Sequence, residues 1–433
     1  MNIKLLKFQK SFKLFTDVKF AIIVLAMIAL FSSFGSFIEQ NESISFYKEN
    51  YPEKIYGFID SEFIIKLGLD HIYTTWWFLL LLLILATCLL TCTLTRQFPL
   101  FVHSKEYFFK KKETSFIELP FSVKIKSFYY LQELINIKIQ NQHFSIYQHG
   151  NMLYGYKGLI GKLSPILVHL SLLIILLGSC LGAFQNFQAQ EILPKGELFH
   201  IQNTIGIGWS TSLPSLPTRV NEFWVEYQNG RIHQFYSNLS LLDPYGKEIK
   251  SQTISVNNPL RYQNIDFYQS DWNVIGIRVK DKETKEITQL PVFPLQNNSK
   301  SWITWIPPKN QIILLDQFQN TFGCYDSSGN FLGKKSIGDP INEEQILIDF
   351  IPTTGLLIKY YPSIGIIYFG FGLLMITTCF SYFPYTQIWI VQKEKTSWIG
   401  SKTNRGKIQV EIEFENLIRN TEKNLKKLIR LNK

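Results

Sequence analysis

Charge is scarce in this chain, and apolar residues are abundant. Charged residues make up only 18% of the 433 residues, whereas hydrophobic residues make up 46% and aromatic residues 15%. A disordered chain has the opposite balance, and this composition also argues against a purely soluble enzyme. We therefore looked first for segments that could lie in lipid.

Cysteines and known catalytic motifs are also scarce. Five cysteines in a chain of this length cannot form a dense disulfide framework. Residues 185–362 contain no G-x-S-x-G, H-E-x-x-H, C-x-x-C or glycine-rich phosphate loop. Their one thiol is Cys324, which excludes a dithiol redox reaction within that region. No catalytic residue and no metal site is predicted, and we do not expect the chain to act as an enzyme alone.

Four uncharged apolar runs are long enough to cross a bilayer, which takes about 20 residues. They cover residues 20–38, 72–95, 163–184 and 363–383. The first run is too long for the apolar core of a signal peptide and lacks a small-residue cleavage site. The expected fold class is therefore a membrane protein with four transmembrane α-helices.

The segments outside these runs alternate in charge. Formal net charges of +4, −4, +6, −2 and +6 fall on residues 1–19, 39–71, 96–162, 185–362 and 384–433, respectively. Segments rich in Lys and Arg stay on the side of synthesis, so both tails and residues 96–162 are expected inside. The formal charge of +10 is thereby explained without nucleic acid, since no nucleic-acid-reading motif accompanies it.

The large outside segment, residues 185–362, has the pattern of a β-rich domain between the third and fourth spans. Asn229-Gly230 separates two apolar-rich runs, which is a strong hairpin signal, and Asp243–Gly246 reads as a second turn. Residues 326–332 read as one of several further short strands. A sandwich and a partly open barrel both fit this pattern.

His169 is the most informative single residue. It lies seven residues past Lys162 in an apolar run, or about 10 Å along a helix with the usual rise. An imidazole at that depth must find a partner within a helix bundle or a wet cavity. It could form a helix–helix hydrogen bond, relay protons, or ligate haem iron. The small residues Gly178 and Gly182 on the same run predict close approach of another helix.

His71 stands at the outer end of the second run, next to Tyr73, Trp76 and Trp77. The aromatic residues are typical of a membrane-interface belt, and His71 could be a polar neighbour or a second haem ligand. Cys88 and Cys92 share one helix face, where small apolar filler is the simpler interpretation. The basic C-terminal stretch, residues 417–429, is amphipathic and fits a helix on the membrane surface or against a partner.

Three segments make the chain similar to a known family. These are Thr91–Pro99, Tyr156–Gly178 with His169 inside it, and Phe223–Trp272 with Val256-Asn257-Asn258-Pro259-Leu260. In combination, and with the order of spans, they resemble the ResB-like (CcsB-type) cytochrome c biogenesis proteins of System II. The resemblance covers most of the chain. Because no transit peptide is visible and Ile, Lys, Phe and Asn are abundant, the chain looks like a plastid-encoded algal member, with a bacterial member as the alternative.

The resemblance implies a function that composition could not show. Such proteins act with a CcsA-type partner, which carries a Trp-rich haem-binding segment that this chain lacks. Together they deliver haem and attach it covalently to apocytochromes c, here cytochrome f and a soluble c-type cytochrome, on the lumenal side of the thylakoid. The implied cofactor is transient haem, with His169 as the matching family position. His71 is a candidate by placement alone.

Two other functions fit parts of the sequence. A transporter subunit would use His169 as a proton relay but should show more polar residues in several spans. A membrane-anchored scaffold would bind apocytochrome through the β-rich domain without touching haem.

Overall fold

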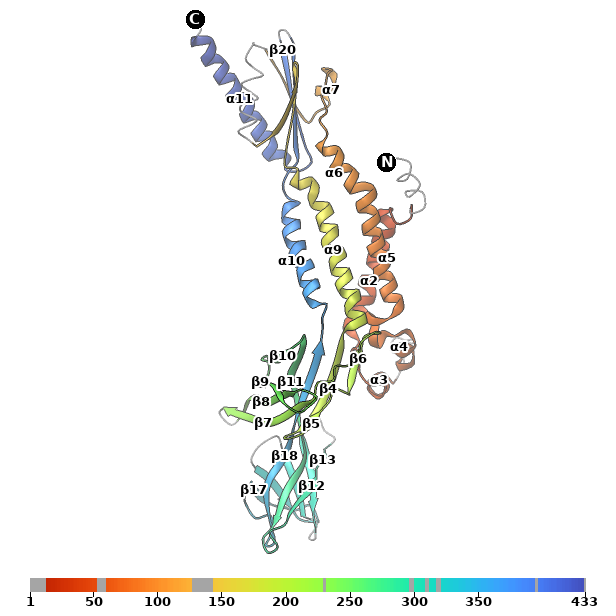
Figure 1. The fold of residues 1–433 in the computed structure, drawn as a ribbon, viewed down its shortest axis with the longest axis vertical. Helices are drawn as coiled ribbons and strands as arrows, with labels where there is room; N and C mark the ends of the chain where they lie inside the picture. Colours follow the sequence, from red (N-terminus) through yellow and green to blue (C-terminus); the bar gives the residue numbers. More distant parts are fainter. Residues whose placement is uncertain are drawn as a thin grey trace. The chain divides into compact units, whose positions relative to one another are not determined.

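The structure is a computed structural model of the chain (Figure 1). It describes residues 13–52, 60–126, 143–228, 231–295, 300–307, 311–316, 321–393 and 396–431. Within them the chain forms two compact units. The helix-and-sheet unit comprises Met1–Ile38, His71–Cys180 and Ile364–Lys433, and the β-rich unit comprises Glu39–Asp70 and Leu181–Ser363.

Three apolar helical stretches in the structure are long enough to cross a membrane. They are α2 (Val18–Phe37), a continuous stretch over Trp76–Lys105, and α9 (Ile160–Gln185). Most of their side chains are not buried by protein, as expected where lipid is the solvent. The helices and the β-rich unit agree with the expected class of membrane protein. The fourth expected span, α10 (Ile364–Phe380), is apolar but has only 17 residues.

The second stretch begins later and runs further than residues 72–95, the range expected from hydropathy. Residues Leu69–Thr74 form a short 3-10 segment, η1, before α5 (Trp76–Cys92) begins. At its other end α5 continues through a π-helical turn, η2 (Thr93–Gln97), into α6 (Phe98–Lys105). Arg96 therefore lies within a helix and not in a loop.

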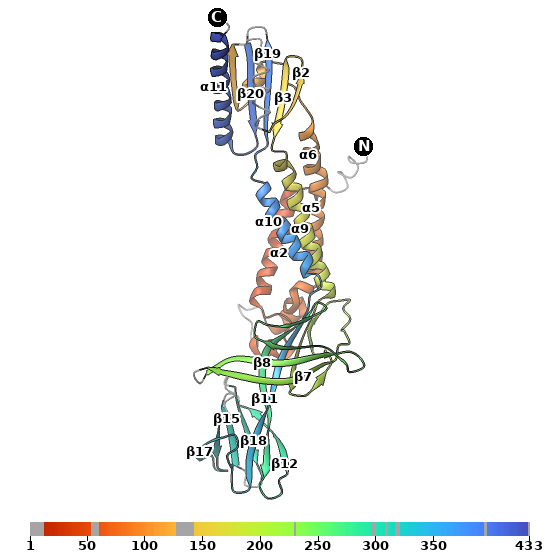
Figure 2. The same cartoon turned by 60° about the vertical axis from the view of Figure 1, so that its left-hand side comes forward.

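Helices α9 and α10 lie side by side in both views and approach each other through glycines (Figures 1 and 2). A Cβ added at Gly178 of α9 would lie 2.7 Å from Ile367 Cγ1 of α10. A Cβ added at Gly370 of α10 would lie 2.7 Å from Ile175 Cγ1 of α9. Each glycine thus receives an isoleucine from the opposite helix, which is the close packing that small residues permit in membranes.

We predict that Gly370→Leu separates α9 from α10, whereas Gly372→Leu does not. Position 372 is on the same helix, and among the described residues nothing lies within 4 Å of its added Cβ. Overpacking of this kind costs about 1–3 kcal/mol. The thermal unfolding midpoint of the detergent-purified protein should fall for Gly370→Leu only. Equal midpoints for the two variants would contradict the packing described here.

The two basic segments expected on the inside fold together into one antiparallel sheet. Its order is β1-β20-β19-β3-β2. The strands are β1 (Phe121–Lys126), β2 (Ser145–His149), β3 (Met152–Lys157), β19 (Thr386–Lys393) and β20 (Thr396–Thr403). Strands from before α9 thereby pair with strands from after α10. Both segments must therefore lie on the same side of any membrane that these helices cross.

Helix α11 (Lys407–Leu431) covers one face of this sheet. Phe414 and Leu417 are buried against Ile388, Ile390 and Ile399 of the sheet. The amphipathic stretch expected to lie on a membrane or a partner thus uses part of its apolar face within the chain. Leu425, Leu428 and Ile429 belong to the same stretch, and their side chains lie outside the part that the structure describes.

The β-rich unit has two apolar cores that share two long strands. Strands β11 (Ile265–Asp281) and β18 (Gln345–Tyr360) pair antiparallel along almost their whole length. The first core lies at one end of this ribbon and includes Val220 and Leu239. The second core lies at the other end and includes Trp302 and Ile313. The unit is thus neither one sandwich nor one barrel, but two sheet packings in series along one ribbon.

The remaining strands complete three sheets in this unit. The ribbon is extended by β4 (Phe187–Pro194), β6 (Thr204–Ile207), β10 (Leu260–Tyr262) and β12 (Ile287–Pro291). The second sheet holds β5 (Leu198–Phe199), β7 (Thr218–Gln228), β8 (Arg231–Leu242) and β9 (Glu248–Ser255). The third holds β13 (Phe293–Pro294), β14 (Ser301–Ile306), β15 (Gln311–Asp316), β16 (Thr321–Tyr325) and β17 (Phe331–Ser336).

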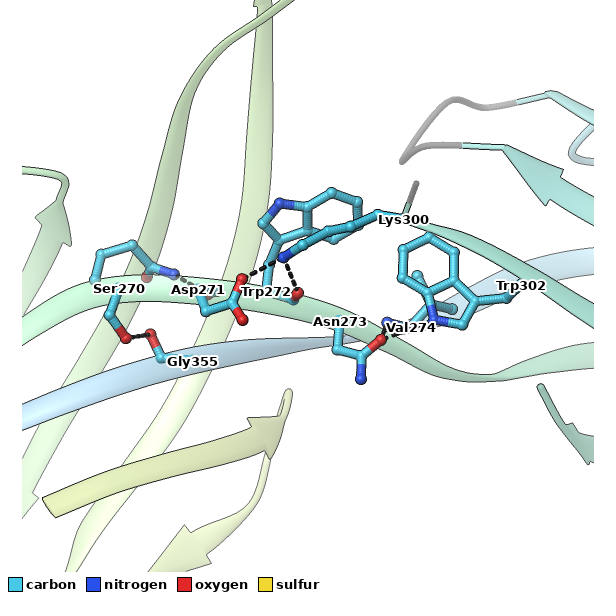
Figure 3. Close-up of polar contacts among 9 residues, drawn as sticks. Ser270, Asp271, Trp272, Asn273, Val274, Lys300, Trp302 and Gly355 are labelled. Atoms are coloured by element: carbon cyan, nitrogen blue, oxygen red, sulfur yellow. Dashed lines mark hydrogen bonds and ion pairs between the residues drawn. The ribbon is translucent and has the colours of Figure 1, made fainter. Parts of the chain in front are cut away.

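A β-bulge and a cation clamp mark the place where the two cores meet (Figure 3). The register of β11 on β18 shifts between Gln269 and Asp271. Just beyond it, Lys300 Nζ pairs with Asp271, donates to the Trp272 carbonyl at 2.8 Å and lies 4.7 Å from the centre of the Trp272 ring. Trp302 Nε1 donates to Asn273 Oδ1 at 2.8 Å. These contacts fix β14 to the ribbon at the bulge.

The hairpin and one turn predicted for the β-rich unit form, whereas one predicted strand begins later than expected. Strands β7 and β8 pair as the expected hairpin, although its Asn229-Gly230 turn lies outside the described residues. At Asp243–Gly246 a turn forms, with Asp243 Oδ1 accepting from the Lys247 amide at 2.8 Å. The strand expected at 326–332 begins only at Phe331. Asp326 instead closes a turn. The hydrogen bond from the Asn330 side chain, followed by those from backbone amides, lowers the pKa of its carboxyl group.

Candidate functional site at a membrane histidine

His169 of α9 lies against the π-helical turn η2 at the end of α5. Repeated threonines explain why the helix widens here. The hydroxyls of Thr87, Thr93 and Thr95 each donate to the backbone carbonyl four residues earlier, at 2.7–2.8 Å. Such bonds compete with regular backbone pairing and bend helices. The Phe98 amide accordingly donates to the Thr93 carbonyl, five residues back. Single π-turns of this kind are rare and occur often at functional sites.

Both nitrogens of the His169 ring contact groups of α5 and η2. Nδ1 lies 2.9 Å from Thr93 Oγ1 and 3.4 Å from the Leu89 carbonyl oxygen. Nε2 lies 3.1 Å from Gln97 Nε2. The ring is half-buried by protein at this position. Of the roles considered for this imidazole, the helix–helix hydrogen bond is the one present in the structure.

The partners of the ring determine where its proton sits. Thr93 Oγ1 donates its hydrogen to the Leu89 carbonyl at 2.8 Å, so towards His169 it can only accept. The Leu89 carbonyl can also only accept. Both contacts therefore need a hydrogen on Nδ1. The lone pair then lies on Nε2, where it accepts from the Gln97 amide group, which carries only hydrogens on its nitrogen.

Of the two polar atoms of the Gln97 side chain, only Nε2 has a hydrogen-bond partner among the described residues. Its Oε1 atom is buried and has no hydrogen-bond partner within the described chain. An unpaired buried carbonyl carries a desolvation cost of about 1–3 kcal/mol. The site therefore holds an imidazole lone pair covered by an amide whose own oxygen remains unpaired.

This arrangement can serve as a single neutral nitrogen ligand. A neutral imidazole whose second nitrogen donates to a hydroxyl or carbonyl is the usual form of a metal-ligating histidine. Among the described residues no group of three or more His, Cys, Asp and Glu could hold a bare metal ion. A metal bound through His169 would thus have to bring most of its own ligands, as the iron of haem does.

His71, the second candidate, lies in η1 at the opposite end of α5. It is exposed, and its backbone (φ −145°, ψ 45°) interrupts the helical geometry of that segment. Its carbonyl accepts from Thr74 Oγ1 at 3.1 Å. The 17 residues of α5 separate it from Thr93 by about 25 Å at 1.5 Å per residue. The structure therefore does not bring His71 and His169 together, and they could not ligate the same iron.

The other histidines and cysteines form no further site. The histidines at 103, 143, 149, 200 and 233 are exposed, and all five cysteines are free. Thr93 and Gln97 are the residues that sequence reasoning missed. They lie in the segment Thr91–Pro99, which the family resemblance had singled out, but no periodicity predicts that a π-turn would direct both towards a histidine 76 and 72 residues away.

The fold and the site define a membrane protein in which apolar helices hold a polar histidine contact and carry a large β-rich domain. The sequence profile of the ResB-like family matches residues 18–321, and the chain belongs to that family. A protein named cytochrome c biogenesis protein Ccs1 from Thalassiosira pseudonana is 43% identical over 95% of this chain and all of its own length. Proteins named Ccs1 from Phaeodactylum tricornutum and CcsB from Crocosphaera subtropica are 40% and 39% identical, over 95% and 96% of this chain and 100% and 95% of their own lengths.

Proposed function

We propose that this chain is a membrane subunit required for the biogenesis of c-type cytochromes. It acts with a CcsA-type partner in delivering haem and attaching it covalently to apocytochromes c, among them cytochrome f and a soluble c-type cytochrome. Support comes from relatives of matching length that are named cytochrome c biogenesis proteins, in diatoms and in a cyanobacterium. Those relatives favour a plastid thylakoid location, with a bacterial plasma membrane as the alternative.

The proposed topology has four spans, with α10 as the short fourth. The pairing of β3 with β19 supports it, because it requires α9 and α10 together to cross and return. The basic segments around that sheet favour the stromal side for it under the positive-inside rule. The β-rich unit, which connects α9 to α10 in sequence, then faces the lumen. There it holds apocytochrome near the partner, so that its contribution is proximity.

The observation that carries the proposal is the lone pair on His169 Nε2. When haem is bound, its iron would accept that lone pair, and ligation biases the redox state of the iron. The protein's own part is to hold the ring in one orientation and one tautomer through Thr93 and Leu89. A neutral ligand in a water-poor bundle suits transient passage of haem rather than acid–base catalysis, so the chain alone is not proposed to be an enzyme.

The first test replaces His169 in a reconstituted pathway. The full chain is expressed with its CcsA-type partner and a C-x-x-C-H reporter in a bacterial host without its own cytochrome c maturation system. His169→Ala should lower covalent haem in the reporter by about tenfold or more, since even indirect partners of a ligating histidine are worth 10- to 100-fold. The measurement is haem staining of the denatured reporter, normalised to membrane levels of both subunits.

Ser179→Ala is the matched control for this test. Ser179 lies on the same helix, and its hydroxyl donates only to the Ile175 carbonyl one turn earlier, at 3.0 Å. It should leave reporter haem unchanged. Full maturation with His169→Ala at normal protein levels would exclude the ligand role and leave the chain as a scaffold for apocytochrome.

The second test uses the separation of the two histidines. Because His71 cannot share an iron with His169 in this structure, His71→Ala should leave the haem absorption spectrum of the purified complex unchanged wherever His169→Ala alters it. Reporter maturation is measured in parallel. Identical spectral changes in both variants would show that the two rings meet in a conformation other than this one.

A further inference from the structure

We infer that Thr93 and Gln97 are positioning residues with opposite roles at the two nitrogens of His169. Thr93 fixes the proton on Nδ1, and Gln97 reversibly covers the Nε2 lone pair. This inference rests on the proposed function, because it concerns the same ring. It adds a mechanism by which the ring keeps one orientation in the absence of haem, while Gln97 occupies the Nε2 lone pair.

The first step of the argument is the direction of the hydrogen bonds. The chain of donors runs from Gln97 to Nε2, from Nδ1 to Thr93, and from Thr93 to the Leu89 carbonyl. Each link follows from what its atoms can do, since the carbonyl at the end accepts only. Reversing the tautomer would require Thr93 to abandon Leu89 and Gln97 to turn its amide over.

The second step is the asymmetry between the two sides. On the Nδ1 side Thr93 and Leu89 both lie within reach, at 2.9 and 3.4 Å, and the Leu89 carbonyl belongs to the backbone of α5. On the Nε2 side there is one contact, from a flexible side chain whose Oε1 is buried without a partner within the described chain. The Gln97 side chain is thus held less firmly than Thr93 and Leu89. Its rotation away from Nε2 would expose the lone pair while the ring stays in place.

The third step is the local backbone. The π-turn Thr93–Gln97 is what presents these two side chains to α9 from one segment. Pro99 follows within the first turn of α6, where it needs no amide hydrogen, so the chain can leave the π-turn as a helix. The π-turn, a rare backbone conformation, therefore positions the contacts of both ring nitrogens of His169.

The test compares Gln97→Leu with Thr93→Val in the full chain, purified with its CcsA-type partner. Gln97→Leu removes only the cover, so haem retained per complex should stay equal or rise. Thr93→Val removes the hydroxyl that receives the Nδ1 hydrogen, so retained haem should fall by about tenfold, and Thr93→Ser should restore it. Haem is measured by the Soret band, and the reduction potential is recorded for each variant.

A second readout does not depend on haem. In membranes of the haem-free full chain, the ¹⁵N resonances of histidine-labelled protein report the tautomer of His169, identified by its loss in His169→Gln. The wild type and Gln97→Leu should carry the hydrogen on Nδ1, whereas Thr93→Val should show a mixed population. Thermal unfolding midpoints of all variants serve as the measure of a purely structural effect.

The outcomes separate this inference from the proposed function. If His169→Ala abolishes maturation while Gln97→Leu and Thr93→Val lower haem equally and in step with their unfolding midpoints, the positioning roles are wrong and the ligand role stands. An Nε2-protonated wild type would also overturn the inference. If His169→Ala matures the reporter fully, the proposed function fails first, and the tautomer measurement still decides what Thr93 and Gln97 do to the ring.

Discussion

Polar groups held at membrane depth must find their partners inside the protein, and this constraint organises the helical part of the chain. His169 cannot rely on water, so its ring is met on both nitrogens by the end of α5. Those contacts fix both the position of α9 along η2 and the rotation of α9 about its own axis. The glycine and isoleucine contacts between α9 and α10 fix a position further along α9, at Gly178. Helix α9 is therefore held by packing against α10 and by hydrogen bonds to η2.

The five-stranded sheet that contains β3 and β19 extends this constraint beyond the helices. Tyr385 donates its hydroxyl to the Ser104 carbonyl at 2.7 Å, and Trp389 Nε1 donates to the Phe108 carbonyl at 2.7 Å. Residues that follow α10 thus hold the end of α6, which continues from the π-turn. The buried Tyr385 hydroxyl also has its pKa raised, chiefly by burial, so it stays protonated and remains a donor. The sheet consequently supports the segment that presents Thr93 and Gln97.

The parts of this fold that were predictable from the sequence are those set by local composition. Apolar runs identified the long helices, and charge assigned residues 96–162 and 384–433 to one side, as their shared sheet requires. In the β-rich unit, Asp243-Pro244 marked a turn, and β7 and β8 pair as the expected hairpin. The sheet that contains β3 and β19 was not predicted, because these strands are 229 positions apart at the register pair Thr386–Lys157 and neither segment is apolar enough to stand out. His169 was predictable as a buried polar group. Its partners were not, because the π-turn arises from threonine side chains that bond backwards along α5.

The strength of the hydrogen bond from Gln97 to His169 Nε2 bears on whether haem would bind tightly or transiently. A neutral hydrogen bond such as that from Gln97 contributes about 0.5–1.5 kcal/mol net, which corresponds to roughly a tenfold change in an equilibrium constant at most. Displacing it therefore costs little, and re-forming it competes weakly with iron for the same lone pair. A single imidazole with such a competitor binds less firmly than two opposed ligands would, and the 17 residues of α5 keep His71 from supplying the second. Under the proposed function, haem held by His169 would receive no second ligand from His71, and this agrees with a role shared with a CcsA-type partner.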